Sequence, residues 1–373
     1  MTLSFEQGPI RPPSEAASLL LRLTRNCPWN KCTFCRSYHG ATFSRRCVAD
    51  IKEDIDKVAS MCISIRQSCR GDDIDMDVLL KLHHGGNFQA FHVASWLYHG
   101  GKNVFFQDAN SLVMQPAEIV EILNYMKERL PWVERVTTYA RSSTLARRSV
   151  EDLTAMKNAG LSRIHVGMES GSDAVLKMIN KGTTARKHIE AGQRVKAAGI
   201  SLSEYIILGM GGKALSREHS IETANVLNQI DPNYIRIRSL TIPKNTTLSK
   251  MVQNGEFQEE TDPEVITGAR LLVENLAGID SNIVSDHSLN LLEEVNGRLP
   301  EDKQALLAIY DRYLNLPEKD RLIFSLGKRW GLYRVLDDLY DPANYAQVSE
   351  VYERLEKQGA YRGTLSELKN LVI

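Results

Sequence analysis

The sequence predicts an α/β fold: a partial (β/α)6 barrel of the TIM type with a C-terminal helical extension. Six short runs suited to strands alternate with helical stretches, which is typical of parallel βαβ units. Polar residues also gather where the predicted strands end, and barrels and open α/β sheets place their chemistry at those ends. From Asp262 onward only helical periodicity follows. Within the 373 residues we therefore predict an N-terminal extension at 1–17, the barrel core at 18–247 and a C-terminal helical cap at 248–373.

The six predicted strands are short and rich in apolar or β-branched residues. They are Ser18–Thr24, Asn103–Asp108, Arg135–Tyr139, Arg163–Glu169, Leu202–Gly209 and Tyr234–Leu240. Helices are predicted at 48–69, 116–129, 149–158 and 216–229, with further helical stretches between the fourth and fifth strands. An insert at 72–101 carries four histidines, which are His83, His84, His92 and His99. We interpret them as surface or lid residues, because their spacing matches no metal-binding motif.

Three closely spaced cysteines, Cys27, Cys32 and Cys35, follow the first predicted strand in a C-x4-C-x2-C pattern. A closed structural zinc site or a ferredoxin-type cluster takes four protein ligands, so three ligands leave one metal position open. An open position is what a catalytic centre needs. The spacing therefore favours a catalytic metal centre on the loop after the first strand.

The other three cysteines fit a helix better than a second cluster. Cys62 and Cys69 recur with apolar residues at steps of three and four, which is the stripe of an amphipathic helix. Free cysteines on such a stripe commonly behave as small buried hydrophobic residues. We therefore interpret Cys62 and Cys69, and also Cys47, as structural.

The composition argues against two classes of partner. Lys plus Arg and Asp plus Glu number 46 each, so no net positive charge favours nucleic acid or an anionic membrane. No apolar run approaches the roughly 20 residues of a spanning helix, and no signal peptide opens the chain. We expect a cytoplasmic protein, in a compartment where thiols stay reduced, with no nucleic-acid and no membrane partner.

Charged residues interrupt two of the predicted strands. Because side chains alternate along a strand, Glu169 shares one face with His165, and Arg236 shares one face with Arg238. Strands of a parallel sheet are usually apolar on both faces, and a buried charge is costly unless it binds something. We favour a polar ligand at these strand ends. The alternative is that these residues form buried ion pairs within the barrel.

At these residues the sequence resembles the radical S-adenosylmethionine (radical SAM) superfamily. The resemblance is carried by the cysteine loop, by Val166-Gly-Met-Glu-Ser-Gly171 and by Asn180-Lys181-Gly182, and it spans roughly Leu19 to Thr247. It is strongest to the branch of oxygen-independent coproporphyrinogen oxidases, methylthiotransferases and Elongator-type proteins. Two features depart from the family pattern. The first cysteine gap holds four residues instead of three, and the second strand ends in Gln-Asp-Ala-Asn where a Gly-Gly-Glu type of segment is usual.

The resemblance implies an oxidoreductase whose cofactors are a [4Fe-4S] cluster, held by the three loop cysteines, and S-adenosylmethionine. Reductive cleavage of S-adenosylmethionine would give a 5′-deoxyadenosyl radical that abstracts hydrogen from a substrate, and an electron donor such as flavodoxin or ferredoxin would be a partner. Glu169 would hydrogen-bond S-adenosylmethionine, and Lys181 would pair with its carboxylate. The other residues implied at this site are Phe34, Asp108, Ala109, Asn110, Tyr139, Ser142 and Tyr205.

The sequence also points to a class of substrate. Arg236 and Arg238 lie near the expected mouth of the barrel, and arginine is well suited to bidentate capture of carboxylate or phosphate. The polar segment 285–290 interrupts the C-terminal helices where the chain could fold back over that mouth. We predict a small anionic substrate, held by one of the two arginines and covered by Asp286, His287 and Asn290. The alternative is a solvated loop beside a buried ion pair.

Two other functional classes use the same cysteines. An iron–sulfur electron carrier or sensor would need neither Glu169 nor Lys181. A zinc-stabilised barrel without activity would need a fourth ligand, for which His39 is the nearest candidate.

The division of the cysteines into two groups can be tested by substitution. Cys27→Ala, Cys32→Ala and Cys35→Ala should each abolish iron incorporation after anaerobic reconstitution, whereas Cys62→Ala should keep it, because only the loop thiols are placed to hold a cluster. Iron per chain is the measurement. Loss of iron from a folded Cys62→Ala protein would contradict the division.

Overall fold

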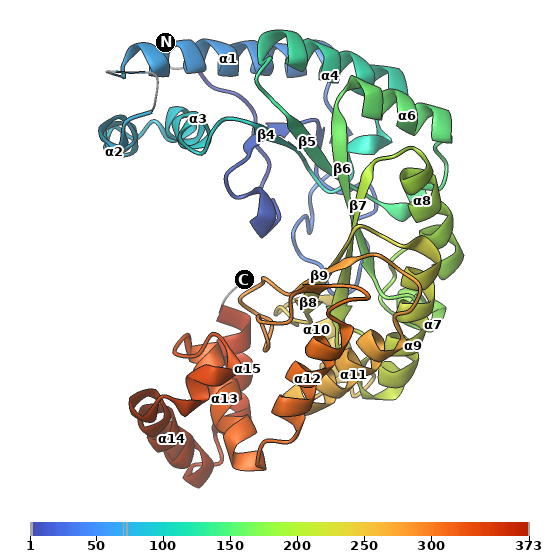
Figure 1. Cartoon of the computed structure of the whole chain (residues 1–373), viewed down its shortest axis with the longest axis vertical. Coiled ribbons are helices and arrows are strands. Elements are labelled where there is room, and N and C mark those ends of the chain that lie inside the picture. Colours follow the sequence, from blue (N-terminus) through green and yellow to red (C-terminus); the bar gives the residue numbers. More distant parts are fainter. Residues whose placement is uncertain (1–2, 70, 72–73, 372–373) are drawn as a thin grey trace. The chain divides into compact units, whose positions relative to one another are not determined.

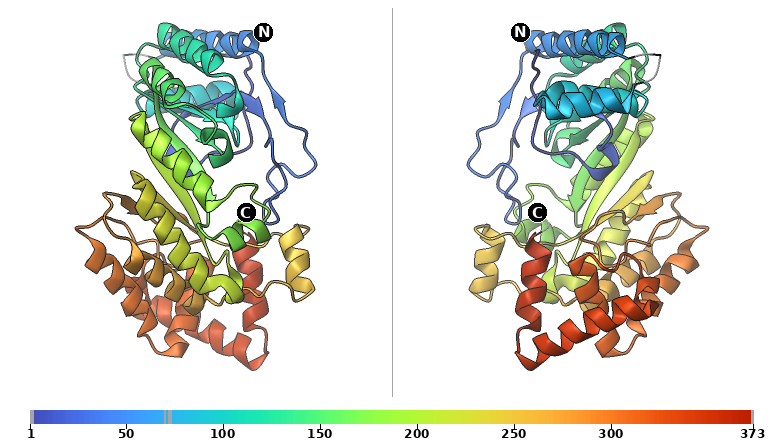
Figure 2. Two further views of the ribbon diagram at one scale, coloured as in Figure 1. Left: turned by 90° about the vertical axis from the view of Figure 1, so that its right-hand side faces the viewer. Right: turned by 90° about the vertical axis from the view of Figure 1, so that its left-hand side faces the viewer.

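The structure is a computed structural model that describes residues 3–69, 71 and 74–371. The chain divides into two units (Figures 1 and 2). The first comprises Met1–Asn30, Ser37–Val166 and Gln193–Leu202, and the second Lys31–Arg36, Gly167–Gly192 and Ser203–Ile373. None of the helices in the described ranges combines the length and apolar character that crossing a membrane requires.

Parallel strands form the centre of the first unit. β1 (Leu19–Arg22), β4 (Asn103–Gln107), β5 (Arg135–Ala140) and β6 (Leu161–Glu169) pair in that order, which is also their order along the chain. Helices α1 (Val48–Gln67), α4 (Pro116–Arg129) and α6 (Val150–Ala159) pack successively against one another beside them (Figure 1). Apolar strand residues such as Leu19, Phe105 and Ile164 are fully buried, as expected for strands covered on both faces.

Shorter elements complete the first unit. They are η1 (Pro13–Glu15), β2 (Thr24–Arg25), β3 (Ser44–Arg45), α2 (Met76–His84), α3 (Phe88–Tyr98), η2 (Ser111–Val113) and α5 (Ser142–Leu145). β2 and β3 pair antiparallel on either side of the cysteine loop. The start of the predicted insert, residues 72–73, lies outside the described residues.

The second unit continues the parallel pattern. β7 (Ser201–Leu208) pairs with β8 (Tyr234–Ser239), β8 pairs with β9 (Asn282–Val284), and β10 (Gly297–Arg298) closes antiparallel on β9. The helices before the cap are α7 (Asp173–Met178), α8 (Ala185–Ala197), α9 (Gly212–Ile230) and α10 (Thr247–Gln253). The later helices, orange to red in Figure 1, are α11 (Asp262–Asn275), α12 (Lys303–Leu314), α13 (Glu318–Trp330), η3 (Leu336–Tyr340), α14 (Pro342–Lys357) and α15 (Tyr361–Leu371).

The predicted α/β fold is confirmed. Each of the six predicted strands is present as β1, β4, β5, β6, β7 and β8, the paired ones are parallel, and helices follow them, so the connectivity is that of a partial (β/α)6 barrel. The region after Asp262 is mainly helical as predicted, and the short strands β9 and β10 between α11 and α12 were not predicted. Strands of two or three residues are too short to show a period in the sequence.

Two smaller predictions also need correction. The first helix ends at Gln67 instead of Cys69. His92 is not a surface residue: its side chain is partly buried, and its Nε2 accepts a hydrogen bond from the backbone N–H of Leu20 in β1. Burial, and then the nearby charge of Arg11, lowers the pKa of His92 to about 4. This histidine therefore fastens α3 to the first strand as a neutral side chain.

Candidate active site

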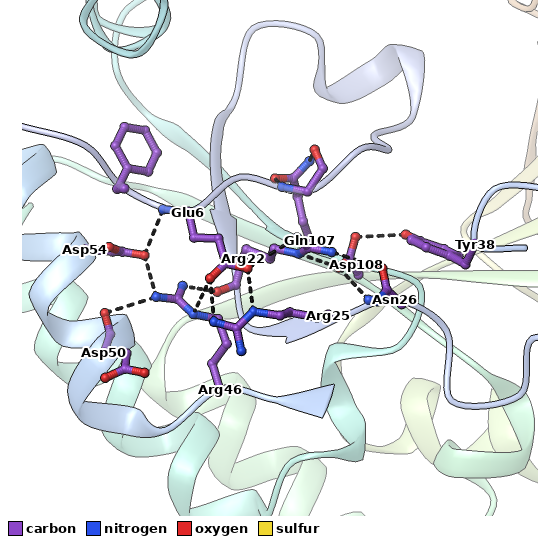
Figure 3. A network of polar contacts seen from close by, with 12 residues as sticks. Glu6, Arg22, Arg25, Asn26, Tyr38, Arg46, Asp50, Asp54, Gln107 and Asp108 are labelled. Atoms are coloured by element: carbon purple, nitrogen blue, oxygen red, sulfur yellow. Dashed lines mark hydrogen bonds and ion pairs between the residues drawn. The ribbon is translucent and has the colours of Figure 1, made fainter. Parts of the chain in front are cut away.

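The two ends of the cysteine loop are anchored on one buried carboxylate, that of Asp108 (Figure 3). Its Oδ2 accepts hydrogen bonds from Arg22 Nε at 2.7 Å and from the backbone N–H of Asn26 at 3.0 Å. Its Oδ1 accepts one from the Tyr38 hydroxyl at 2.8 Å. Asn26 directly precedes Cys27, and Tyr38 follows Cys35 by three residues. Asp108, which comes directly after β4, therefore holds both ends of the loop.

A second hub, Glu6, fixes the strand that leads into the loop. It accepts hydrogen bonds from Arg22 at 3.2 Å and from two nitrogens of Arg25 at 2.7 and 2.6 Å, and Arg46 approaches it at 3.3 Å (Figure 3). Arg46 also pairs with the buried Asp54 at 2.7 Å. Burial would raise the pKa of Glu6, but Arg25 and Arg46 outweigh burial and lower it. One N-terminal carboxylate therefore pairs with three arginines next to the loop.

The middle of the loop, residues 31–36, belongs to the second unit and lies beside the chain that follows α7. The Thr33 N–H donates to the Ile179 carbonyl at 2.9 Å, and Asn180 Nδ2 donates to the Lys31 carbonyl at 3.0 Å. Phe34 packs against an apolar cluster that includes Val175 and Ile179. Local packing thus accounts for Phe34, and its predicted contact with a nucleoside stays a prediction.

The loop cysteines differ in environment from the others. Cys27, Cys32 and Cys35 are reduced cysteines at intermediate exposure. By contrast, Cys47 Sγ caps α1 by accepting from the Asp50 N–H, Cys69 Sγ donates to the Ile65 carbonyl, and burial raises the pKa of Cys62 to about 12. Among the described residues, no three His, Cys, Asp or Glu side chains stand close enough to hold one metal ion. The assignment of the three loop thiols to a cluster stays a prediction.

Glu169 and Lys181, predicted to hold S-adenosylmethionine, lie together in the second unit. Lys181 Nζ donates to Glu169 Oε1 at 2.6 Å, and both side chains are about nine-tenths buried. The space for this pair depends on Gly167, because a Cβ at that position would lie 2.4 Å from Glu169 Oε1 and 3.1 Å from Lys181 Nζ. Asn180, the residue directly before Lys181, donates a hydrogen bond to the cysteine loop.

The residues around Glu169 explain the Glu-Ser-Gly sequence at the end of β6. Glu169 has φ 63°, a left-handed conformation that is uncommon outside glycine and is often found at functional sites. The Ser170 hydroxyl lies 2.8 Å from His219 Nδ1 in α9. A Cβ on Gly171 would lie 2.4 Å from the Glu222 carbonyl, so only glycine allows β6 to approach α9 this closely. These contacts turn the chain sharply at the strand end and expose the carboxylate of Glu169 to Lys181.

One carboxyl group near this pair was missed by sequence reasoning. Glu204 in β7 is 1% exposed, and burial, together with the negative charge of Glu169, raises its pKa well above the ordinary value despite Lys181. The signal was available, since a glutamate stands within the apolar strand Leu-Ser-Glu-Tyr-Ile-Ile-Leu.

The remaining predicted S-adenosylmethionine residues have structural roles in the first unit. Asn110 is buried, donates to Thr144 Oγ1 at 2.8 Å and accepts from the Arg141 N–H at 3.0 Å. Ala109 is partly buried, Ser142 is buried at the start of α5, and the half-buried Tyr139 ring lies 5.2 Å from that of Phe105. Three protein donors already bind the Asp108 carboxylate, and its predicted contact with S-adenosylmethionine stays a prediction.

The predicted substrate residues meet at the ends of β8 and β9. Asp286 accepts from Arg236 Nη1 at 3.2 Å and from Arg238 Nη1 at 3.3 Å. The Tyr205 ring centroid lies 4.9 Å from the guanidinium carbon of Arg238 and 6.0 Å from that of Arg236. The structure therefore brings the arginines, Asp286 and Tyr205 together in one charged group. Both the ligand and the ion-pair interpretation of these arginines are compatible with it.

The segment 285–290 is fastened to β8. Asn290 Nδ2 donates to the Ile237 carbonyl at 2.9 Å, and its Oδ1 accepts from Ser239 Oγ at 3.2 Å. His287 Nδ1 accepts from the Leu289 N–H at 3.2 Å. Burial, and then the positive charge of Arg238, lowers the pKa of His287, so the imidazole is neutral near neutral pH. Asp286 itself is partly exposed, at 39%.

Comparison with known proteins points to a family. Residues 93–224 match the profile of the Radical SAM superfamily, so this part of the chain resembles that superfamily. The match supports an enzyme whose cofactors are a [4Fe-4S] cluster and S-adenosylmethionine. The matched range carries Glu169, Lys181 and Tyr205, and the cysteine loop precedes it.

The chain is similar to parts of larger proteins. The tRNA uridine(34) acetyltransferase of Methanocaldococcus infernus is 26% identical over 129 residues, which cover 34% of this chain and 24% of the relative. The protein of the same name from Methanocaldococcus jannaschii is 23% identical over 127 residues, covering 33% of this chain and 24% of the relative. The chain thus spans about a quarter of the length of these two relatives.

Solved structures also align with the chain. Methanocaldococcus infernus Elp3 with an N-terminal deletion gives a TM-score of 0.43 at 16% identity, covering 56% of this chain and 55% of that chain. The cobalamin-dependent S-adenosylmethionine radical enzyme OxsB gives a TM-score of 0.45 at 16% identity, covering 93% of this chain and 51% of that chain.

Substitution of either member of the buried pair tests its predicted role. Glu169→Gln and Lys181→Gln should each keep the absorption of the iron–sulfur cluster but weaken S-adenosylmethionine binding by roughly 1.5–3 kcal/mol, the scale of a charge-assisted hydrogen bond. Isothermal calorimetry under anaerobic conditions measures the affinity. Unchanged affinity in both variants would reject the roles assigned to them.

Substitution of the loop anchor gives a second test with a matched control. Asp108→Asn should loosen both ends of the cysteine loop, because it weakens buried charge-assisted hydrogen bonds worth roughly 1.5–3 kcal/mol each. Iron per chain should fall and bleaching in air should accelerate. Asp56 also accepts from an arginine and a tyrosine, Arg129 and Tyr125, but on the surface, so Asp56→Asn should leave both measurements unchanged. Equal iron retention in the two variants would show that Asp108 does not organise the loop.

Proposed function

We propose that this chain is a radical SAM enzyme in which Cys27, Cys32 and Cys35 hold the [4Fe-4S] cluster and which acts on a small anionic substrate. When bound, the cluster supplies the one electron that splits S-adenosylmethionine into methionine and a 5′-deoxyadenosyl radical, which removes a hydrogen atom from the substrate. The observation that carries the proposal is the buried Glu169–Lys181 pair, which directly follows a residue that contacts the cysteine loop.

The chain's own residues position the cofactor. Lys181 offers an ammonium group to the carboxylate of S-adenosylmethionine, and Glu169 offers a carboxylate to hydroxyl or amino groups. The space over Gly167 keeps both side chains next to each other. An electron carrier or sensor with the same cysteines would not require this pair, so the pair favours the enzyme over that alternative.

The charge at the end of β8 supports an anionic substrate. Two arginines share the single carboxylate of Asp286, which leaves the group with one excess positive charge. Arg238 Nη2 is buried and has no hydrogen-bond partner among the residues that the structure describes. A buried donor without a partner is costly, and a carboxylate or phosphate would satisfy it. Asp286, His287 and Asn290 would cover the bound substrate.

The comparisons bear on the other substrate class. We predicted no nucleic-acid partner from the balance of charges, but relatives of this chain are named tRNA uridine(34) acetyltransferases. Transfer RNA is therefore the alternative substrate, and the stimulation experiment described below, which includes ribonuclease treatment, distinguishes it from a small anion. The electron donor, such as flavodoxin or ferredoxin, is part of the proposal.

Anaerobic reconstitution tests the proposed activity. After loosely bound iron is removed, the reconstituted protein should hold about four irons per chain. It should form 5′-deoxyadenosine and methionine from S-adenosylmethionine on addition of dithionite. Chromatography of both products is the measurement. A protein that holds the cluster and accepts electrons but forms neither product would favour the electron carrier.

Stimulation of the same reaction tests the substrate class. An anaerobic cell extract should accelerate formation of 5′-deoxyadenosine, and the stimulating fraction should pass a small-molecule filter, bind an anion exchanger and survive ribonuclease. Arg238→Gln should reduce the stimulation while leaving the unstimulated rate unchanged. Loss of stimulation after ribonuclease treatment would contradict a small anionic substrate and favour RNA as the substrate.

A further inference from the structure

The second unit contains a cavity that the proposed active site does not use. Residues at the beginning of α11 and in the helices α13 and α15 line a cavity of about 460 Å³. Tyr313, Arg321 and Arg329 line it, together with Asp262 and Arg362. Neither the cysteines nor the arginines of β8 take part in it.

Buried polar atoms without hydrogen bonds line this cavity. Within the described part of the chain, Arg321 Nε and Arg329 Nε are buried and lack a hydrogen-bond partner. The Arg329 side chain is only 4% exposed. The Tyr313 hydroxyl and Asp262 Oδ2 also make no hydrogen bond of normal geometry there, although the Ser325 side chain is near enough to act on the pKa of both groups. Buried donors and acceptors rarely lack a hydrogen bond, so several such atoms in one cavity indicate a ligand.

The charge around the cavity favours an anion. Five cationic and four acidic side chains line it. Lys213 and Lys369 are neutralised by Glu264 and Glu259, and Arg329 pairs with Asp262 at 3.4 Å. Arg321 and Arg362 have no carboxylate partner within the described ranges.

The acidic side chains offset this charge only in part. Burial raises the pKa of Glu260, and Glu264 adds to the effect, so Glu260 carries less negative charge than an exposed glutamate. For Asp262, burial alone would raise the pKa, but Arg329 and Lys369 lower it. Asp262 therefore stays an ionised acceptor beside the unpaired donors.

We propose that this cavity binds a small molecule that carries a carboxylate or a phosphate group. Arg321, Arg329 and the Tyr313 hydroxyl would donate to the oxyanion, since guanidinium groups match the geometry of both. Asp262 Oδ2 would accept from a hydroxyl or amino group elsewhere on the same molecule. The inference does not rest on the proposed radical chemistry.

Arg329 also connects this cavity with the segment over β8. Its Nη1 donates to the Leu289 carbonyl at 2.6 Å, and Leu289 lies between His287 and Asn290. A smaller cavity of about 20 Å³, enough for one water molecule, shares Arg329 and Asp262 and reaches Ser239 at the end of β8. The proposed ligand site and the segment 285–290 therefore share one anchor.

Calorimetry on the full-length, cluster-loaded chain tests the proposal, with inorganic phosphate and succinate as separate probes and without S-adenosylmethionine or reductant. At least one probe should bind, and which one binds distinguishes a phosphate ligand from a carboxylate ligand. Arg321→Gln and Tyr313→Phe should each weaken that binding about tenfold, which is the effect of one hydrogen bond. Since Tyr313→Phe removes only a hydroxyl group, it serves as the test even where Arg321→Gln fails to fold.

Matched controls come from the same helical region. Arg312→Gln removes an arginine paired with the exposed Asp337, and Tyr345→Phe removes a hydroxyl bonded to Asp320, both outside the cavity lining. Both controls should bind the probe like the unmodified chain. The proposal is overturned if neither probe binds. It is also overturned if Tyr313→Phe and the unmodified chain bind the probe with equal affinity. Because no turnover is measured, failure of this site is distinct from failure of the radical SAM activity.

Discussion

A buried charge costs several kcal/mol unless an opposite charge or hydrogen bonds compensate it, and this constraint governs the ends of the strands in this protein. After β4, Asp108 is compensated by an arginine, a backbone N–H and a tyrosine hydroxyl. At the end of β6, Glu169 is compensated by Lys181. Beside β8, the two arginines are compensated by Asp286. Each of these compensations also fixes a loop, so the electrostatic constraint determines where functional groups stand.

The loop that carries the cysteines shows how this works. A glycine-poor loop with three thiols has no core of its own, and its conformation must come from outside contacts. Its ends are held by Asp108, and its middle by the backbone groups of Thr33 and Ile179. The three thiols stay partly exposed while the surrounding backbone is hydrogen-bonded. A cluster with one open iron needs accessible ligands on a well-anchored loop, and the assignment of these thiols to it stays a prediction.

Much of the fold and part of the site could be predicted from the sequence. Strand and helix positions follow from local periodicity. For this reason the six longer strands were recognised, while the two- and three-residue strands β2, β3, β9 and β10 were not. The polar set on β6 and β8 was recognised because charges inside parallel strands are rare. Glu204 carried the same signal and was overlooked. Its environment became evident only when burial and the neighbouring Glu169 were known.

By itself the sequence determined the α/β class, the separation of Cys27, Cys32 and Cys35 from the helix cysteines, and the presence of charges at strand ends. All of these depend on residue type and spacing within short windows. Only the tertiary structure decided which charges meet: that Glu169 pairs with Lys181, that Asp286 lies between Arg236 and Arg238, and that Asp108 holds both ends of the cysteine loop. In the last two groups, the aspartate lies 48 to 86 positions from each of its partners in the sequence. Their contacts depend on how β-strands and helices pack over long distances along the chain, which local patterns do not encode.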